Sequence, residues 1–127
     1  MKIFNNESWS EKVNFVDENN VVVGYDMSQH CCENAGYYFT GDEPHEKQAV
    51  ETRDDKDPPE SELAPYRFDP EWFRELSMVY DGGACAFRLT APNLPDKYLV
   101  LFNSHNGYYS HGFTMEVGGV QKREGRN

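Results

Sequence analysis

Two short runs near the start of the chain constrain its fold more than any other feature. Residues 12–15, KVNF, alternate polar and apolar side chains, which is the period of a strand with one buried face. Residues 21–25, VVVGY, are rich in β-branched side chains that favour strands. Residues 17–20, DENN, lie between the runs and readily form turns. The pattern therefore predicts an early β-hairpin.

Three later stretches also predict strands. Residues 37–39, YYF, are aromatic, and in residues 84–91 a larger apolar side chain recurs at every second position. Residues 98–102, YLVLF, are apolar without interruption. A continuous apolar run of this length indicates a central strand that is covered on both faces.

The pair Asn106-Gly107 is the strongest short hairpin signal in the chain, because a type I′ turn needs positive φ at both central positions. We expect it to connect residues 98–102 to a returning strand over residues 108–117. Residues 118–127 are basic and polar, and they are expected to form a frayed tail.

One stretch, residues 68–76, has the features of a helix. Asp69 suits the N-cap, and Pro70 suits the first helical position. Trp72 and Leu76 are four residues apart, so a helix would place both side chains on one apolar face. The sequence therefore predicts an α+β fold, with an antiparallel sheet of about five to seven strands and one short helix.

Residues 41–64 differ in composition from the rest of the chain. Positions 41–62 hold nine acidic residues, three Lys or Arg residues and three prolines. Because apolar side chains are few, burial of this segment would contribute little to offset the entropy lost on ordering. We expect a single domain over residues 1–127, from which this segment extends as an acidic, mobile surface insertion.

The net charge of −10 argues against two classes of partner. A nucleic-acid binder needs a basic footprint to neutralise phosphates, and an anionic membrane surface would repel this chain. Two interpretations of the acidity stay open: it keeps a small domain soluble and monomeric, or it binds a partner protein with a basic surface. The charge says nothing about the oligomeric state.

The number of cysteines and the shortness of the apolar runs bear on the cellular compartment of the protein. No apolar h-region follows the first residues, and no apolar run approaches the roughly 20 residues that span a bilayer. Three cysteines, an odd number, are a poor basis for a disulfide framework. We therefore expect a cytoplasmic protein with reduced thiols.

Two clusters of reactive side chains are candidates for a binding site. The first holds His30, Cys31, Cys32 and Glu33, and the second holds His105, Asn106, Tyr108, Tyr109 and His111. With Cys85 they supply enough donors for zinc, but adjacent cysteines point to opposite sides of a strand and no CxxC pair is present. A Cys–His nucleophile would need a positive charge to lower the pKa of the thiol, and none is close in sequence.

A purely structural role in the core also fits the same residues. Free cysteine is among the most buried residue types, so the three cysteines are expected to pack in the core. His111 shares a strand face with Phe113, as expected of a half-buried histidine. The aromatic residues 37–39, Tyr108 and Tyr109 could stack a nucleotide base, although strands favour the same side chains. We expect no cofactor, with zinc as the alternative.

Three of these stretches, VNFVDENNVVVGYD, HCCENAGYYF and LFNSHNGYYSHGF, resemble a family of small uncharacterised bacterial and phage-type proteins. The similarity covers roughly residues 13–39 and 68–119, including a Cys-Cys-Glu motif and a His-Asn-Gly-Tyr-Tyr turn. The resemblance implies a compact β-rich fold and no particular activity.

The sequence contains no assembled catalytic motif, so we expect a binding protein rather than an enzyme. The expected function is protein–protein contact by a small acidic cytosolic protein, for example an inhibitor or accessory factor of a phage or mobile element. Two alternatives stay open: a metal-binding or thiol-dependent enzyme that uses the two clusters, and a binder of a small ligand such as a nucleotide.

Overall fold

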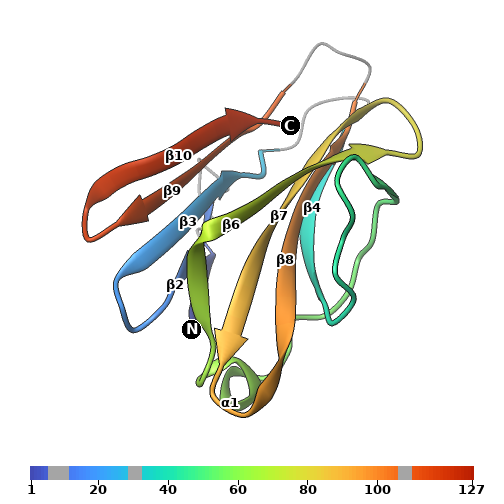
Figure 1. Cartoon of the computed structure of the whole chain (residues 1–127). Helices are drawn as coiled ribbons and strands as arrows, with labels where there is room; N and C mark the ends of the chain where they lie inside the picture. Colours follow the sequence, from blue (N-terminus) through green and yellow to red (C-terminus); the bar gives the residue numbers. More distant parts are fainter. Residues whose placement is uncertain (6–11, 29–32, 106–109) are drawn as a thin grey trace.

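Two β-sheets packed face to face form the body of the protein (Figure 1). The computed structural model describes residues 1–5, 12–28, 33–105 and 110–127. The first sheet has the strand order β1-β2-β3-β9-β10, and the second has the order β4-β8-β7-β6-β5. Neighbouring strands run antiparallel, except that β5 and β6 are parallel.

The strands differ greatly in length, and the described helix is a single turn. The first sheet consists of β1 (Lys2–Asn5), β2 (Lys12–Val16), β3 (Val21–Asp26), β9 (Gly112–Val117) and β10 (Val120–Arg126). The second consists of β4 (Asn34–Thr40), β5 (Ala49–Val50), β6 (Arg67–Met78), β7 (Gly82–Ala91) and β8 (Leu94–Ser104), and α1 is Glu60–Leu63. No helix in the described ranges has the length and apolar composition that crossing a bilayer requires.

The predicted α+β fold is wrong, because the residues expected to form the helix are part of strand β6. The segment pairs with β7 at Phe68 and again from Phe73 to Leu76. The Phe68 ring also packs edge-on against the Phe87 ring, with 6.4 Å between the ring centroids. The pairing register shifts between Phe68 and Phe73, so Asp69 and Pro70 lie in an irregular stretch of the strand. Proline has no backbone N–H to donate to a neighbouring strand, so it is tolerated where the pairing of strands is interrupted. The helix-start signals therefore mark a strand irregularity.

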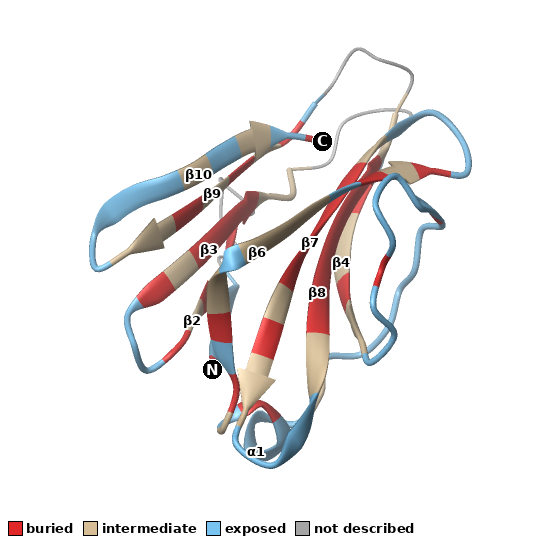
Figure 2. Cartoon of the chain, viewed as in Figure 1, coloured by how far each residue is buried: buried red, intermediate tan, exposed pale blue. Residues whose placement is uncertain are grey.

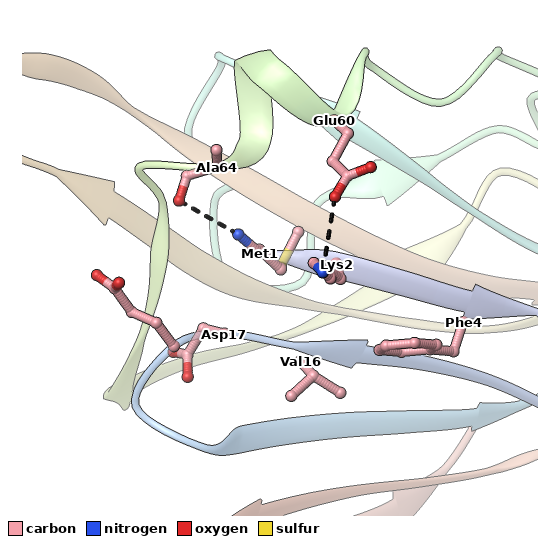
Figure 3. A pocket seen from close by; sticks show the side chains of 8 residues that line it. Met1, Lys2, Phe4, Val16, Asp17, Glu60 and Ala64 are labelled. Carbon is pink, nitrogen blue, oxygen red and sulfur yellow. Dashed lines mark hydrogen bonds and ion pairs between the residues drawn. The ribbon is translucent and has the colours of Figure 1, made fainter.

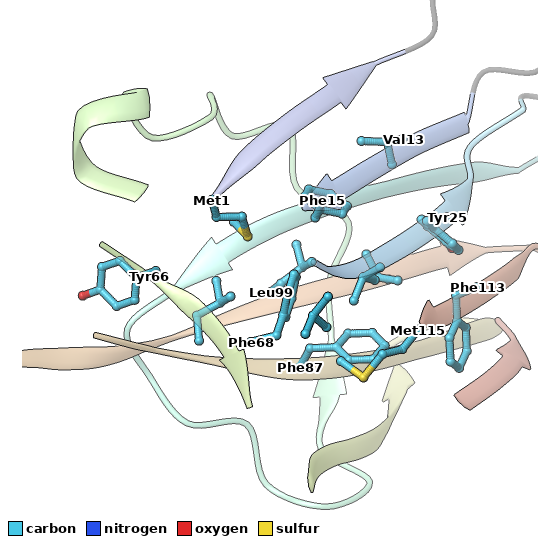
Figure 4. Packing of buried hydrophobic residues seen from close by; sticks show 14 of the residues in the cluster. Met1, Val13, Phe15, Tyr25, Tyr66, Phe68, Phe87, Leu99, Phe113 and Met115 are labelled. Carbon is cyan, nitrogen blue, oxygen red and sulfur yellow. The ribbon is translucent and has the colours of Figure 1, made fainter. Parts of the chain in front are cut away.

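The early hairpin is confirmed as β2 and β3, which pair with Val13 opposite Tyr25 and Phe15 opposite Val23. These four side chains are all buried in the main core between the sheets (Figure 4). Asn20 in the intervening turn has a φ of 59°, the left-handed conformation that asparagine tolerates.

The late hairpin is wrong, because the strands on either side of the predicted turn belong to different sheets. Strand β8 pairs with β4 and β7, whereas β9 pairs with β3 and β10. Asn106 and Gly107 lie outside the described residues. The residues expected to form a frayed tail pair with β9 as strand β10, through a turn at Gly118 and Gly119. Both glycines have positive φ, as a type I′ turn requires.

The prediction of a strand covered on both faces is confirmed for β8, whose residues 98–103 are all buried (Figure 2). Leu99 and Leu101 point into the main core between the sheets. Val100 and Phe102 point the other way, into a second apolar cluster on the outer face of the second sheet. Strand β8 therefore needs a layer on each side.

The outer layer is formed by the acidic segment, residues 41–64. Val50 is buried in the outer cluster, and the Arg53 guanidinium lies 4.1 Å from the centre of the Tyr38 ring on β4. The Tyr98 hydroxyl on β8 donates a hydrogen bond of 3.3 Å to Glu43. A few anchors thus hold the segment against the sheet. Its expected mobility stays a prediction.

Asp17 connects the early hairpin to the second sheet through a buried carboxylate. Its Oδ1 accepts hydrogen bonds from the amides of Asn19 and Val21, and its Oδ2 accepts one of 2.9 Å from the amide of Phe68 on β6. One side chain therefore caps the turn and joins the two sheets.

Replacement of Asp17 by alanine is expected to lower the free energy of unfolding by about 2–4 kcal/mol, because the buried amides of Val21 and Phe68 lose their acceptor. Urea unfolding followed by tryptophan fluorescence measures the change. Glu18→Ala is the matched control, since its carboxylate pairs with Arg67 at the surface, and its unfolding midpoint should shift much less. Equal shifts would contradict the role of Asp17.

Candidate functional site

The two clusters predicted from the sequence meet at one contact between Glu33 and His111. Nε2 of His111 lies 2.9 Å from Oε2 of Glu33. Glu33 directly precedes β4 in the second sheet, and His111 directly precedes β9 in the first, so the contact joins the sheets at one end of the sandwich (Figure 1). The side chains are 0% and 2% exposed, respectively. Both side chains of the contact are therefore buried.

The hydrogen bonds of His111 fix where its protons lie. Nδ1 is 2.5 Å from the backbone carbonyl of Asp26, and because a carbonyl can only accept, Nδ1 carries a proton and donates it. Nε2 faces the Glu33 carboxyl group at hydrogen-bond distance. The ring of His111 is therefore held from both of its nitrogens.

Hydrogen bonds of the uncharged side chains of Asn127 and Tyr25 continue from this pair into the core. The backbones of His111 and Asn127 exchange hydrogen bonds of 3.0 and 2.9 Å. The Asn127 side-chain amide donates to the Leu101 carbonyl, and the Tyr25 hydroxyl donates to the Phe102 carbonyl at 2.8 Å. Burial raises the pKa of the Tyr25 phenol, so it stays protonated and keeps donating. These contacts connect the first sheet to β8.

Cys85 is packed in the main core, as predicted for a cysteine with a purely structural role. Its side chain is buried between the sheets, with the Asn127 amide nitrogen 3.7 Å from its Sγ. Burial raises the pKa of the thiol, which keeps it protonated and unreactive. Cys85 is therefore not the nucleophile of a thiol enzyme.

The remaining candidate residues are divided between the described and undescribed ranges. His105 follows β8, where its amide donates to the Asp81 carbonyl at 3.1 Å. The others, His30, Cys31, Cys32, Asn106, Tyr108 and Tyr109, lie outside the described residues. Within the described ranges no three His, Cys, Asp or Glu side chains gather closely enough to hold a metal ion. A zinc site that includes Cys31 or Cys32 stays a prediction.

The aromatic residues of β4 are occupied by packing. Tyr37 and Phe39 meet the Phe15 ring edge-on at 4.9 and 6.0 Å. The Tyr37 hydroxyl donates to Asp57 and accepts from Asn5, and burial raises the pKa of this phenol. These rings serve the core and the outer layer, so they do not offer an open platform for a nucleotide base.

A groove beside strand β1 was not anticipated from the sequence. A pocket of about 300 Å³ has a largely apolar lining that includes Phe4, Val16 and Ala64 (Figure 3). A second pocket, of about 370 Å³, is lined on its apolar side by Ile3, Pro58 and Leu63. We call the two pockets together the β1 groove. Its only sequence signal is the short apolar pair Ile3-Phe4, which is too brief to identify a surface.

A third and more polar pocket, of about 740 Å³, lies between β4 and the acidic segment. Arg53, Asp54 and Asp57 line one side of it, and Asn34 and Tyr37 line the other. Its charged wall belongs to the same acidic segment that borders the β1 groove. The acidic segment therefore borders all three of these pockets.

Comparison with known proteins provides no relative for this chain. No family model, no curated protein and no solved structure matches it. The resemblance to small phage-type proteins therefore stays an expectation from the sequence.

A double-mutant cycle tests the contact between Glu33 and His111. For Glu33→Ala, His111→Ala and the double variant, we expect a coupling of about 1–3 kcal/mol in the free energy of unfolding, because the hydrogen bond is buried. The pair Lys47 and Glu75, 2.7 Å apart at the surface, is the control and should show a markedly smaller coupling. Additive effects at Glu33 and His111 would contradict the contact.

Proposed function

We propose that this protein is a non-catalytic binding protein whose acidic segment recognises a basic surface on another protein. The observation that carries the proposal is that every carboxylate of the segment is exposed, although the segment is anchored to the second sheet (Figure 2). These residues are Asp42, Glu43, Glu46, Glu51, Asp54, Asp55, Asp57, Glu60 and Glu62.

The charge of the segment is not balanced locally. It holds six more carboxylates than cations, and two of its three cations, Lys47 and Arg53, already pair with Glu75 and Asp55. Glu46 has no ion-pair partner among the described residues. Such an excess of one sign creates a field that attracts a surface of the opposite sign and speeds association.

The anchors explain how a polar segment can present a defined surface. Val50, the Arg53–Tyr38 contact and the hydrogen bond from Tyr98 to Glu43 limit the positions that the chain from Glu43 to Arg53 can take. A partner would therefore meet carboxylates that are already partly arranged, which lowers the entropy lost on binding. The form of this proposal that the sequence favours is a cytoplasmic inhibitor or accessory factor of a phage or mobile element.

Charge reversal in the acidic segment tests the proposal. The full chain is immobilised and incubated with bacterial lysate, and captured proteins are identified by mass spectrometry at low and high salt. We expect basic proteins that are released by salt, and a roughly tenfold loss of their capture for Glu46→Lys/Glu51→Lys.

The matched control is Glu116→Lys/Glu124→Lys, which makes the same change of charge on β9 and β10 of the first sheet. It should retain capture of the same proteins. Capture that is insensitive to salt, or that falls equally in both variants, would contradict recognition by the acidic segment.

The contact between Glu33 and His111 favours a second candidate function, a metal-dependent or thiol-dependent site. It brings together one residue from each of the two sequence clusters and supplies two possible metal ligands. Elemental analysis of the purified chain tests it. Zinc or iron near one equivalent that is lost in His111→Ala would favour this function, and metal far below one equivalent would count against a metal site.

A further inference from the structure

We propose that the β1 groove binds the side chain of one arginine of the basic partner, with its guanidinium group over the Phe4 ring and its charge facing Glu60. This inference rests on the proposed function, because it names one side chain by which the partner is recognised. Phe4 lies outside the acidic segment, so the inference can fail while recognition by that segment holds.

The two pockets beside β1 are parts of one groove, and Phe4 and Glu60 lie where the parts meet. Among the described residues, four line both pockets: Met1, Lys2, Phe4 and Glu60. The pocket of about 300 Å³ is at the small end of the range for ligand sites, so one long side chain fits it better than a larger ligand. Figure 3 shows the Phe4 ring beside Val16, and Glu60 joined to Lys2.

Several aromatic rings near the surface of this protein are covered by a cation of the same chain. Guanidinium carbons lie 4.1 Å from the centre of the Tyr38 ring, 4.7 Å from that of Phe73 and 5.0 Å from that of Trp72. Phe4 is 53% exposed, yet no cation lies over its ring in the described ranges, which hold every Lys and Arg of the chain. A guanidinium group of another protein can therefore occupy this place.

The lining of the groove fits an arginine better than a lysine. Val16 and Ala64 form an apolar wall against which the methylene stem of a long basic side chain can lie. The guanidinium group is planar, so it can stack on an aromatic ring and donate two parallel hydrogen bonds to one carboxylate. A lysine ammonium group is a compact, strongly hydrated charge and makes neither contact in this way.

Glu60 can accept the charge of that arginine. Its ion-pair partner in the described chain is Lys2, at 4.0 Å, and the two side chains are 73% and 69% exposed. So long and exposed a pair stabilises little, and a carboxylate has room for more than one donor. Glu18, the other exposed carboxylate of the first pocket, already pairs with Arg67. Glu60 is therefore the carboxylate that we assign to the arginine.

The test titrates three blocked tripeptides, acetyl-Gly-X-Gly-amide, into the isotope-labelled full chain and follows the backbone amides by nuclear magnetic resonance. X is arginine, citrulline, which has nearly the same shape without the charge, or norleucine, which keeps only an apolar stem. We expect saturable shifts at the amides of Phe4 and Glu60, with citrulline and norleucine roughly fivefold or more weaker than arginine. Equal binding of the three, or no saturable shift at these amides, would overturn the inference.

Two variants and a matched control locate the binding. Phe4→Leu keeps an apolar wall without the aromatic ring, and Glu60→Gln removes the charge, so each should weaken the arginine peptide roughly threefold or more. Glu62→Gln is the control on the same helical turn, because Glu62 pairs with Lys97 at 2.9 Å and is not among the lining residues. The control should bind the peptide like the unchanged chain. Equal losses for Glu60→Gln and Glu62→Gln would reduce the effect to general charge and overturn the groove.

The peptide titration and the lysate capture separate this inference from the proposed function. If the arginine peptide binds through Phe4 and Glu60 while capture ignores salt and Glu46→Lys/Glu51→Lys, the arginine site stands and recognition by the acidic segment falls. If capture depends on those charges but the three tripeptides bind equally, the arginine site falls and the proposed function stands.

Discussion

Strand β8 is packed on both of its faces, and this double packing sets the positions of the layers around it. Leu99 and Leu101 need the first sheet as a cover, and Val100 and Phe102 need a cover on the outer side. The first sheet meets one need, with the early hairpin at its centre. The acidic segment meets the other, although it has few apolar side chains to contribute.

That shortage of apolar side chains has a functional consequence. Since a few anchors such as Val50 and Arg53 hold the segment against the outer cluster, the carboxylates of the segment remain at the surface. The same segment passes close to β1, where Asp57 and Glu60 line the β1 groove. One stretch of chain thus completes the fold and supplies the charge on which the proposed function depends.

The sequence predicts the parts of this arrangement that depend on local patterns. The early hairpin and the double burial of β8 follow from alternation and from an uninterrupted apolar run. The helix predicted over residues 68–76 is wrong because the helix-start signals at Asp69 and Pro70 are local, whereas the pairing with β7 depends on residues distant in the sequence. The turn signal at Asn106-Gly107 is also local, and it does not say which sheet each flanking strand joins. The positive φ angles of a type I′ turn are found instead at Gly118 and Gly119, between β9 and β10.

The contact between Glu33 and His111 could not be predicted, because it depends on how the two sheets face each other. The two residues are 78 positions apart and precede strands of opposite sheets. The sequence marked both clusters as candidates, but only the packing of the sheets shows that Glu33 and His111 meet. The β1 groove is similar, since it is formed jointly by a four-residue strand and a distant turn of chain.

The most direct test of this account is a nuclear magnetic resonance measurement of the acidic segment on the full chain. If the segment covers β8, nuclear Overhauser effects should connect the Arg53 side chain to the Tyr38 ring, and the amides of Val50 and Arg53 should be as rigid as those of the strands. Absence of these effects, with relaxation typical of an unfolded chain at both anchors, would contradict the outer layer and the binding surface built on it.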